Sequence, residues 1–275
     1  MPDDPAPIPA HDSAHLPAPT AATTRAQARE HEALMLYWLH RFGYLTSTQV
    51  AALVYPSYRQ AEHLARRVLL RLERRGLVLR RPGAPGERGY YALAQEGARV
   101  VIDVYDVQAI SGKDVLRLIS PHRCFANDAV IRLLRSGTKR VWTEREIQRG
   151  AVPFRRLGIK IPDALAADVE GGVTWVEVEA CRRGGRDLKA LAEWLVHTAF
   201  PPSLNFLVPL DSPQDTLFLE RVRFVLAVPQ ARSLPQRLHG ALDHLLGRLD
   251  YDVYDYAANT LEFEIPGQPL RVGFT

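Results

Sequence analysis

The chain has 275 residues, of which 47% are apolar and 24% are charged, with a formal net charge of +4. This composition is that of a globular protein and excludes a fibrous or wholly disordered chain. Two cysteines, Cys124 and Cys181, form neither a disulfide framework nor a zinc motif, and no apolar run reaches the roughly 18 residues of a membrane helix. We therefore expect a cytoplasmic protein without membrane contact.

The first 28 residues differ in composition from the rest of the chain. They are rich in proline, alanine and threonine and show no helical or strand periodicity. Such a segment buries too little apolar surface to order itself. We predict a disordered tail over residues 1–28.

A first domain is predicted over residues 29–105, and it opens with two helices. The first begins near Glu30 and ends near Gly43. Thr46 then has the character of an N-cap, with Gln49 at the capping-box position three residues later. We expect a short second helix from this point.

A third helix and a hairpin complete the predicted domain. The helix runs from about residue 57 to 75, where Gly76 stops it, and its apolar residues recur at helical spacing. Two short strands, "LVLRR" and "GYYAL", follow and are joined by the glycine- and proline-rich loop "PGAPGERG". Three helices followed by a two-stranded wing resemble a winged helix-turn-helix.

Basic residues concentrate on the third helix and the hairpin. A recognition helix lies in the major groove of DNA while basic side chains neutralise phosphates. The residues that we expect to contact double-stranded DNA are Arg59, His63, Arg66, Arg67, Arg71, Arg74, Arg80, Arg81 and Arg88. The alternative is a solvated arginine-rich face of a protein–protein module.

A linker is predicted over residues 106–120, and a second domain over residues 121–275. In this part the strand and helix patterns alternate, which favours an α/β sandwich around a mixed sheet. The stretch "KIPDALAADVEGGVTWVEVEA" (160–180) has the pattern of a β-hairpin within that sheet.

Three carboxylates flank this hairpin. Glu177 and Glu179 are two residues apart on an otherwise apolar strand, so both project from one face, and Asp163 begins the preceding strand. Three oxygen ligands that converge suit Mg²⁺ or Mn²⁺, and such an ion makes buried acids tolerable. Each acid alone also fits a structural role, as the cap of a turn, as a strand-end group solvated by an arginine, or as an edge residue that opposes aggregation.

The order of these residues resembles two related patterns. Pro162-Asp163, then thirteen residues, then Glu177-Val178-Glu179 is similar to the nuclease motif Pro-Asp…(Asp/Glu)-x-Lys, with an acid where that motif has lysine. The chain is more similar to the replication-relaxation family. That resemblance rests on the acid at this position, on the stretch "LTSTQVAALVY…ARRVLLRLERRGLV" and on five further residues. Those further residues are His122, Asn127-Asp128, Trp142 and Glu144.

The resemblance implies a fold, a chemistry and partners. In that family a winged helix-turn-helix precedes a restriction-endonuclease-like PD-(D/E)XK domain of the α/β (α+β) class, and some members are plasmid mobilisation relaxases. It implies Asp163, Glu177 and Glu179 as ligands of Mg²⁺ or Mn²⁺. Asn127 or Asp128 would orient the metal-bound water or the scissile phosphate, and Lys189 would stand in for the missing lysine.

Three functions remain open on the sequence. The first is a metal-dependent DNA nuclease or nicking relaxase of a mobile element, acting in plasmid mobilisation or replication. The second is a non-catalytic DNA-binding regulator of replication, mobilisation or transcription with a degenerate nuclease-like domain. The third is a repressor with a ligand-sensing C-terminal domain. Expected partners are double-stranded DNA, mobilisation or replication proteins, and a second copy of the chain.

Overall fold

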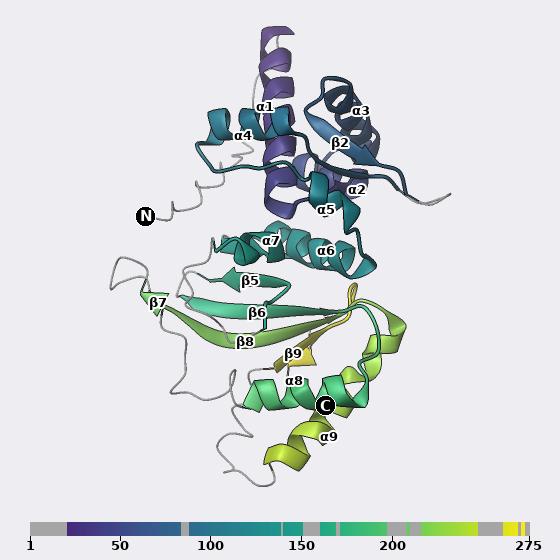
Figure 1. The fold of residues 1–275 in the computed structure, drawn as a ribbon, viewed down its shortest axis with the longest axis vertical. Helices are drawn as coiled ribbons and strands as arrows, with labels where there is room; N and C mark the ends of the chain where they lie inside the picture. The colour runs from purple at the N-terminus through teal and green to yellow at the C-terminus, as the bar shows by residue number, and fades with distance from the viewer. Residues whose placement is uncertain are drawn as a thin grey trace. The chain divides into compact units, whose positions relative to one another are not determined.

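The chain divides into two compact units, Met1–Ile119 and Ser120–Thr275 (Figure 1). A computed structural model describes residues 21–83, 88–138, 140–150, 160–168, 171–196, 208–209, 216–246, 261–268 and 271–272. No helix in these ranges combines the length and the apolar character needed to cross a membrane. Most of the predicted tail, residues 1–20, lies outside the described part.

The described residues of the first unit form five helices and one small antiparallel sheet. The sheet has the strand order β1-β3-β2. In chain order the elements are α1 (Ala21–Phe42), β1 (Leu45–Thr46), α2 (Ser47–Val54), α3 (Ala61–Arg74), β2 (Val78–Arg81), β3 (Tyr90–Leu93), α4 (Gln95–Tyr105) and α5 (Lys113–Arg117).

The first helix begins earlier than the sequence pattern predicts. It starts at Ala21 rather than near Glu30, so it includes residues 21–28 of the predicted tail. The added turns contain alanine, glutamine and arginine, which are good helix formers. They extend a helix that is held by its buried residues from Leu34 to Phe42, because elongating an existing helix needs no new nucleus.

The capping signals in the first unit are confirmed. The Thr46 hydroxyl accepts a hydrogen bond from the Gln49 backbone N–H at 3.3 Å, and the Gln49 side chain accepts one from the Thr46 N–H at 3.0 Å. Gly76 has a φ of +72° at the end of α3, a left-handed conformation that favours glycine. The third helix starts at Ala61 rather than residue 57, since residues 56–60 form turns.

The predicted hairpin is present, with Val78 opposite Leu93 and Arg81 opposite Tyr90. Residues 84–87 of its connecting loop lie outside the described part. The predicted linker contains the short helix α5. The Arg81 guanidinium donates to the carbonyl of Leu116 at 2.7 Å, and so stabilises the C-terminal end of that helix.

The second unit is a mixed sheet with helices on both faces (Figure 1). Neighbouring strands run in the order β10-β9-β8-β6-β5-β4, and β7 pairs with β8; the β6–β8 and β8–β9 pairs are parallel and the others antiparallel. Helices α6 and α7 cover one face, and α8 and α9 the other. The elements are α6 (Pro121–Arg135), β4 (Arg140–Thr143), α7 (Glu144–Gln148), β5 (Ala164–Ala167), β6 (Gly172–Glu179), α8 (Gly185–Trp194), β7 (Val208–Pro209), β8 (Thr216–Leu226), a 3₁₀ helix (Pro229–Ser233), α9 (Leu234–Leu246), β9 (Leu261–Glu264) and β10 (Arg271–Val272).

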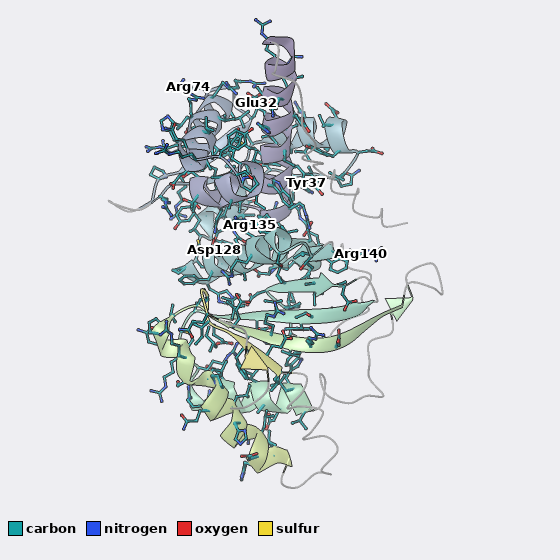
Figure 2. The ribbon with its side chains drawn as sticks, turned by 180° about the vertical axis from the view of Figure 1, so that it is seen from behind. Glu32, Tyr37, Arg74, Asp128, Arg135 and Arg140 are labelled. Atoms are coloured by element: carbon teal, nitrogen blue, oxygen red, sulfur yellow. The ribbon has the colours of Figure 1, made fainter. Side chains whose placement is uncertain are left out.

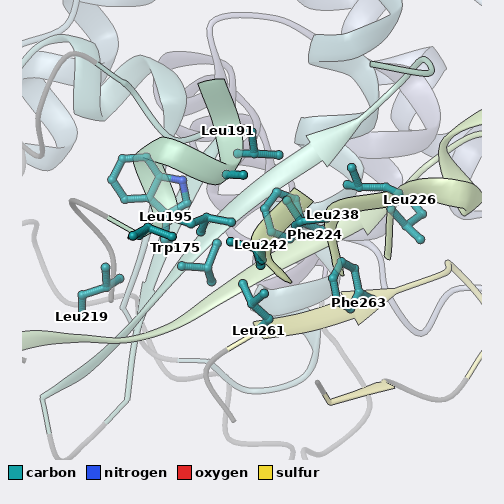
Figure 3. Close-up of a cluster of buried hydrophobic side chains, with 14 of the residues drawn as sticks. Trp175, Leu191, Leu195, Leu219, Phe224, Leu226, Leu238, Leu242, Leu261 and Phe263 are labelled. Carbon is teal, nitrogen blue, oxygen red and sulfur yellow. The ribbon is translucent and has the colours of Figure 1, made fainter. Parts of the chain in front are cut away.

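Trp175 on β6 anchors the core between the sheet and the pair α8 and α9 (Figure 3). Its side chain is fully buried, and its ring centroid lies 4.7 Å from that of Trp194. Phe224 and Phe263 stack with their ring centroids 5.7 Å apart on the neighbouring parallel strands. This core therefore fixes the face of β6 from which Trp175 projects, and the candidate site lies on the same face.

Candidate functional site

The candidate site is built on the in-register pairing of β5 with β6. Ala164 lies opposite Val176, and the Asp163 N–H donates to the Val176 carbonyl at 3.1 Å. Asp163 is therefore opposite Glu177, and opposed residues of an antiparallel pair share a face. Glu179, two residues further along β6, projects from that face too. All three side chains are buried, with 8%, 4% and 3% of their residue surfaces exposed.

Asp163 is held by one backbone and one side-chain partner. Its Oδ2 accepts a hydrogen bond from the Val178 N–H at 2.7 Å. Its Oδ1 lies 2.8 Å from Nε2 of His122, in the first turn of α6. This hydrogen bond raises the pKa of His122 above its ordinary value, against the opposing effect of burial, and the Asp163 charge adds to the rise.

Glu177 forms an ion pair with Lys160. Its Oε2 lies 2.5 Å from the lysine Nζ, and its Oε1 accepts a hydrogen bond from Nε1 of Trp175 at 2.5 Å. Lys160 also lies over the ring of Trp194, 5.1 Å from the centroid. Burial raises the pKa of Glu177, Lys160 opposes that rise, and the nearby Asp163 carboxylate adds to it.

Glu179 is bound at both oxygens by Arg183. The arginine Nε is 2.8 Å from Oε1 and 2.9 Å from Oε2, and its Nη2 is 2.6 Å from Oε1. The same Nη2 is 4.0 Å from Oε2 of Glu177. Burial lowers the pKa of Arg183, but its hydrogen bonds to Glu179 and the charges of the three acids outweigh that effect and raise it.

These contacts decide how well the site fits a divalent cation. The oxygen donors are of the kind that Mg²⁺ and Mn²⁺ prefer. However, the charges of all three carboxylates act on the Arg183 guanidinium, and Lys160 contacts Glu177. Among the residues that the structure describes, no group of three histidine, cysteine, aspartate or glutamate side chains is arranged to hold a metal ion. In this arrangement the described partners of Glu177 and Glu179 are basic side chains, Lys160 and Arg183, rather than a cation.

In the first unit, the basic residues predicted to contact DNA divide into two groups. Some have internal partners: Arg71 pairs with Glu32 of α1, which also binds Arg75 outside the predicted set, and Arg88 pairs with Glu62. Arg81 hydrogen-bonds to α5 as described above. The others are exposed and have no ion pair or hydrogen bond with a described residue: Arg59, His63, Arg66, Arg67, Arg74 and Arg80. We call these six residues the basic surface.

The basic surface joins α3 to the hairpin. Arg66 of α3 and Arg80 of β2 both lie close enough to Tyr91 on β3 to influence its pKa, which burial raises and the two arginines lower. Arg67 acts in the same direction on the pKa of Tyr55, which follows α2. Figure 2 shows Arg74 at the end of α3 and Glu32 on α1. Arg66 of α3 and Arg80 of the hairpin thus lie near the same residue of β3, although the Glu73 carboxylate also acts on Tyr91.

A family model described as replication-relaxation matches residues 36–193. The chain belongs to the replication-relaxation family. The match contains most of the first unit and the second unit as far as α8, including the three buried carboxylates. It confirms the family that the sequence motifs indicate, and it associates the chain with replication. No curated protein and no solved structure matches the chain.

Other residues expected from the family resemblance lie in different surroundings. Lys189 is not brought to the carboxylates: 72% of its side chain is exposed, and it pairs with Glu193 at 3.7 Å. Its neighbours Leu188 and Leu191 face the core, so a lysine at position 189 faces outward. Asn127 is buried on α6 and Asp128 is half-buried; their proposed role in orienting water or phosphate stays a prediction.

Sequence reasoning missed Lys160, and it considered Arg182 or Arg186, rather than Arg183, as the partner of Glu179. Lys160 comes three residues before Asp163, outside any helix or strand, and Arg183 comes four residues after Glu179, beyond the end of β6. The printed stretch "ACRRGGRD" contains three arginines, of which Arg182 and Arg186 are exposed. The sequence does place a basic residue close to each of these acids. Which of the three arginines contacts Glu179, however, depends on the geometry of the turn after β6.

Proposed function

We propose that this chain is a double-stranded-DNA-binding protein of replication or plasmid mobilisation, whose first unit is a winged helix-turn-helix. The observation that carries the proposal is the basic surface, six exposed basic residues that no described acid neutralises. In this proposal α2 and α3 are the helix-turn-helix, α3 is the recognition helix, and the hairpin of β2 and β3 is the wing. Arg80 would contact phosphate from the wing while Arg66 and Arg67 do so from α3.

The internal ion pairs sharpen this proposal. Arg71 and Arg75 share the Glu32 carboxylate, so part of their positive charge is already compensated within the unit. Arg66 and Arg67 have no such partner, and each would release counterions from DNA when it contacts a phosphate. The basic surface, rather than the total number of arginines, should therefore determine how binding depends on salt.

The experiment compares two doubly substituted proteins of equal net charge. Arg66→Ala with Arg67→Ala removes two residues of the basic surface. Arg99→Ala with Arg117→Ala removes two exposed arginines that are paired with Glu96 and Asp114. Duplex affinity is measured over a range of salt concentrations. For the first protein, the magnitude of the slope of log K against log salt should fall by up to about 2. The second protein should keep the wild-type slope. Equal slopes in both would contradict the assignment.

For the second unit we propose a nuclease-like α/β domain that is non-catalytic and serves docking to a partner or a second copy. The observation that supports this is the bidentate contact of Arg183 with Glu179, together with the ion pair of Lys160 with Glu177. Arg183 contacts Glu179, Lys160 contacts Glu177 and His122 contacts Asp163, so each buried carboxylate has a basic partner and folding does not require a metal to neutralise them.

The second candidate function is metal-dependent DNA cleavage, and one observation favours it. Asp163 lies opposite Glu177, with Glu179 on the same face, as the nuclease motif requires. In that case Asp163, Glu177 and Glu179 would hold Mg²⁺ or Mn²⁺ after the basic side chains move. A plasmid-nicking assay with Mn²⁺ separates the two: we expect no cleavage by the wild-type protein. Cleavage that is lost in Asp163→Asn but kept in Lys189→Ala would establish the second candidate.

A further inference from the structure

Arg145 in the first turn of α7 is a buried cation without a counterion in the described structure. Only 6% of the residue surface is exposed, and its Nε is buried with no hydrogen-bond partner. No ion pair or hydrogen bond joins its guanidinium to any described residue. A buried guanidinium that has neither acid nor acceptor is costly to the fold.

The acids nearest in sequence are engaged elsewhere. Glu146 forms the capping box of α7, because its carboxylate accepts the Thr143 N–H at 2.8 Å. Glu144 accepts a hydrogen bond from Gln148 at 2.7 Å and lies 3.7 Å from Nε of Arg123. The capping box fixes the first turn of α7 directly after β4, and Arg145 is the one residue of this helix that is buried. The local structure thus holds the guanidinium inside without supplying its partner.

Two more arginines lie near Arg145. Arg123 is in the first turn of α6, with 16% of its side chain exposed, and Arg149 follows α7 at the surface. Burial, together with the charges of Arg149 and Arg123, lowers the pKa of Arg145 to about 10, and no acid is among the groups that act on it. Glu144 lies near Arg123 and Glu146 acts on Arg149, so among these three arginines it is Arg145 that lacks a nearby acid in the described structure.

We propose that Arg145, with Arg123 and Arg149, binds a phosphate group. A guanidinium presents a planar fork of donors that matches two phosphate oxygens, and a dianion would neutralise the excess charge of this arginine cluster. The exposed Arg149 marks the side from which the anion enters, and the buried Arg145 forms the base of the site. The phosphate group belongs either to a small free anion or to the DNA backbone.

The site does not depend on the basic surface of the first unit. If the source is DNA, the arginine cluster adds a contact in the second unit to the DNA binding proposed above. If the source is a small anion, it gives the second unit a ligand of its own. The experiment therefore uses the full chain and measures the two sources separately.

The first measurement is thermal unfolding in a phosphate-free buffer, with inorganic phosphate added at constant ionic strength. The wild-type Tm should rise with phosphate, and the response should be absent in Arg145→Met. That variant should be at least as stable as the wild type without phosphate, because it lacks an uncompensated buried charge. The control is Arg140→Met, which removes an exposed arginine at the start of β4 (Figure 2) and should keep the response. An equal phosphate response in wild type and Arg145→Met overturns the proposal.

A second variant covers the case in which Arg145→Met does not fold. Arg149→Met replaces an exposed side chain, and it should weaken the apparent phosphate Kd by about tenfold, the effect of losing one hydrogen bond to a charged group. An unchanged Kd in this variant also counts against the site.

The source is identified with a short duplex. If phosphate competes with duplex DNA and Arg145→Met weakens duplex binding, the ligand is the DNA backbone; if neither occurs, it is a free anion. Arg66→Ala with Arg67→Ala should keep the phosphate response in either case. Failure of the DNA-binding proposal and failure of this one are therefore distinguishable.

Discussion

Arg183 binds both carboxylate oxygens of Glu179, with three contacts between 2.6 and 2.9 Å across four residues of sequence. Glu179 ends β6, and the chain that follows folds back so that Nη2 of Arg183 lies 4.0 Å from Oε2 of Glu177. Bidentate pairs of this kind are the strong class of charge-assisted hydrogen bonds. The Arg183 guanidinium therefore neutralises Glu179 and also interacts electrostatically with Glu177 and Asp163.

Replacing Arg183 with methionine should destabilise the fold. The change leaves Glu179, which is 3% exposed, as a buried charge without a partner, and breaking a buried pair from one side costs about 3–5 kcal/mol. We expect the lower end of that range because 23% of the Arg183 side chain is exposed. Urea unfolding measures the loss, and Lys189→Met, which breaks an exposed pair, is the control.

A second substitution tests the reason for that loss. Adding Glu179→Gln to Arg183→Met removes the stranded charge and should recover much of the lost stability. No recovery would mean that the arginine stabilises the fold by packing alone. If Mn²⁺ raises the stability of Arg183→Met but not of the wild type, the acids can hold a cation once the guanidinium is gone, and metal-dependent cleavage gains support.

His122 should make the stability of the second unit depend on pH. Its pKa in the folded protein is raised above the ordinary value of 6.5, principally by the hydrogen bond to Asp163. A raised folded-state pKa means that the stabilisation is fully present below pH 6.5 and is lost as pH rises through the folded-state value. His122→Gln can still donate a hydrogen bond but carries no charge, so the wild type should exceed this variant in stability at acid pH and lose the advantage toward neutral and alkaline pH.

The control for this profile is a double-mutant cycle with Asp163→Asn. In that background His122→Gln should no longer change the shape of the pH dependence, because the partner of the imidazolium is absent. The measurement is the free energy of unfolding at a series of pH values. A pH-dependent difference that persists without the Asp163 carboxylate would assign the effect to another partner of His122.

The features that the sequence predicts are those that depend on neighbours in the chain. Thr46 and Gln49 specify a cap within one turn, and Gly76 stops α3 because it adopts a positive φ. The register that places Asp163 opposite Glu177 also follows from local pattern, since one hairpin connects the two strands. These predictions are confirmed because short-range geometry decides them.

The identity of the cations near the acids could not be read from the same pattern. Lys160 and Lys189 are chemically equivalent candidates, and the choice depends on Lys160 lying over the Trp194 ring while Leu188 turns Lys189 outward. Likewise, Arg71 of α3 contacts Glu32 of α1, although the two residues are 39 positions apart in sequence. Side-chain pairing across elements is set by tertiary packing, for which a single sequence carries no periodic signal.

The hydrogen bond from Trp175 to Glu177 predicts an asymmetry between two neighbouring tryptophans. Trp175 Nε1 donates to the buried Glu177 carboxylate, whereas the buried Nε1 of Trp194 has no acceptor among the described residues. Trp175→Phe should therefore cost about 1–3 kcal/mol more than Trp194→Phe, because it leaves a buried charged acceptor short of a donor. Thermal or urea unfolding of the two variants measures the difference. Equal losses would show that the indole N–H contributes little to holding Glu177.

Two helical glycines should respond in opposite directions to alanine. In an open helix position alanine is favoured over glycine by about 1 kcal/mol. Gly240 in α9 has no atom within 4 Å of an added Cβ, so Gly240→Ala should stabilise the second unit by about this amount. At Gly97 in α4, an added Cβ would lie 2.0 Å from the Leu77 carbonyl oxygen, which already accepts the Ala94 N–H.

Gly97→Ala should therefore destabilise the first unit despite its better helix propensity. The obstructing atom belongs to the backbone beside β2 and cannot rotate away, so α4 or the hairpin must shift, at a typical cost of about 1–3 kcal/mol for overpacking. Because β2 carries Arg80 of the basic surface, the shift should also weaken duplex binding. Urea unfolding and a duplex titration, each with Gly240→Ala beside it, measure the two effects. A Gly97→Ala protein as stable as the wild type would mean that α4 does not pack against Leu77 this closely.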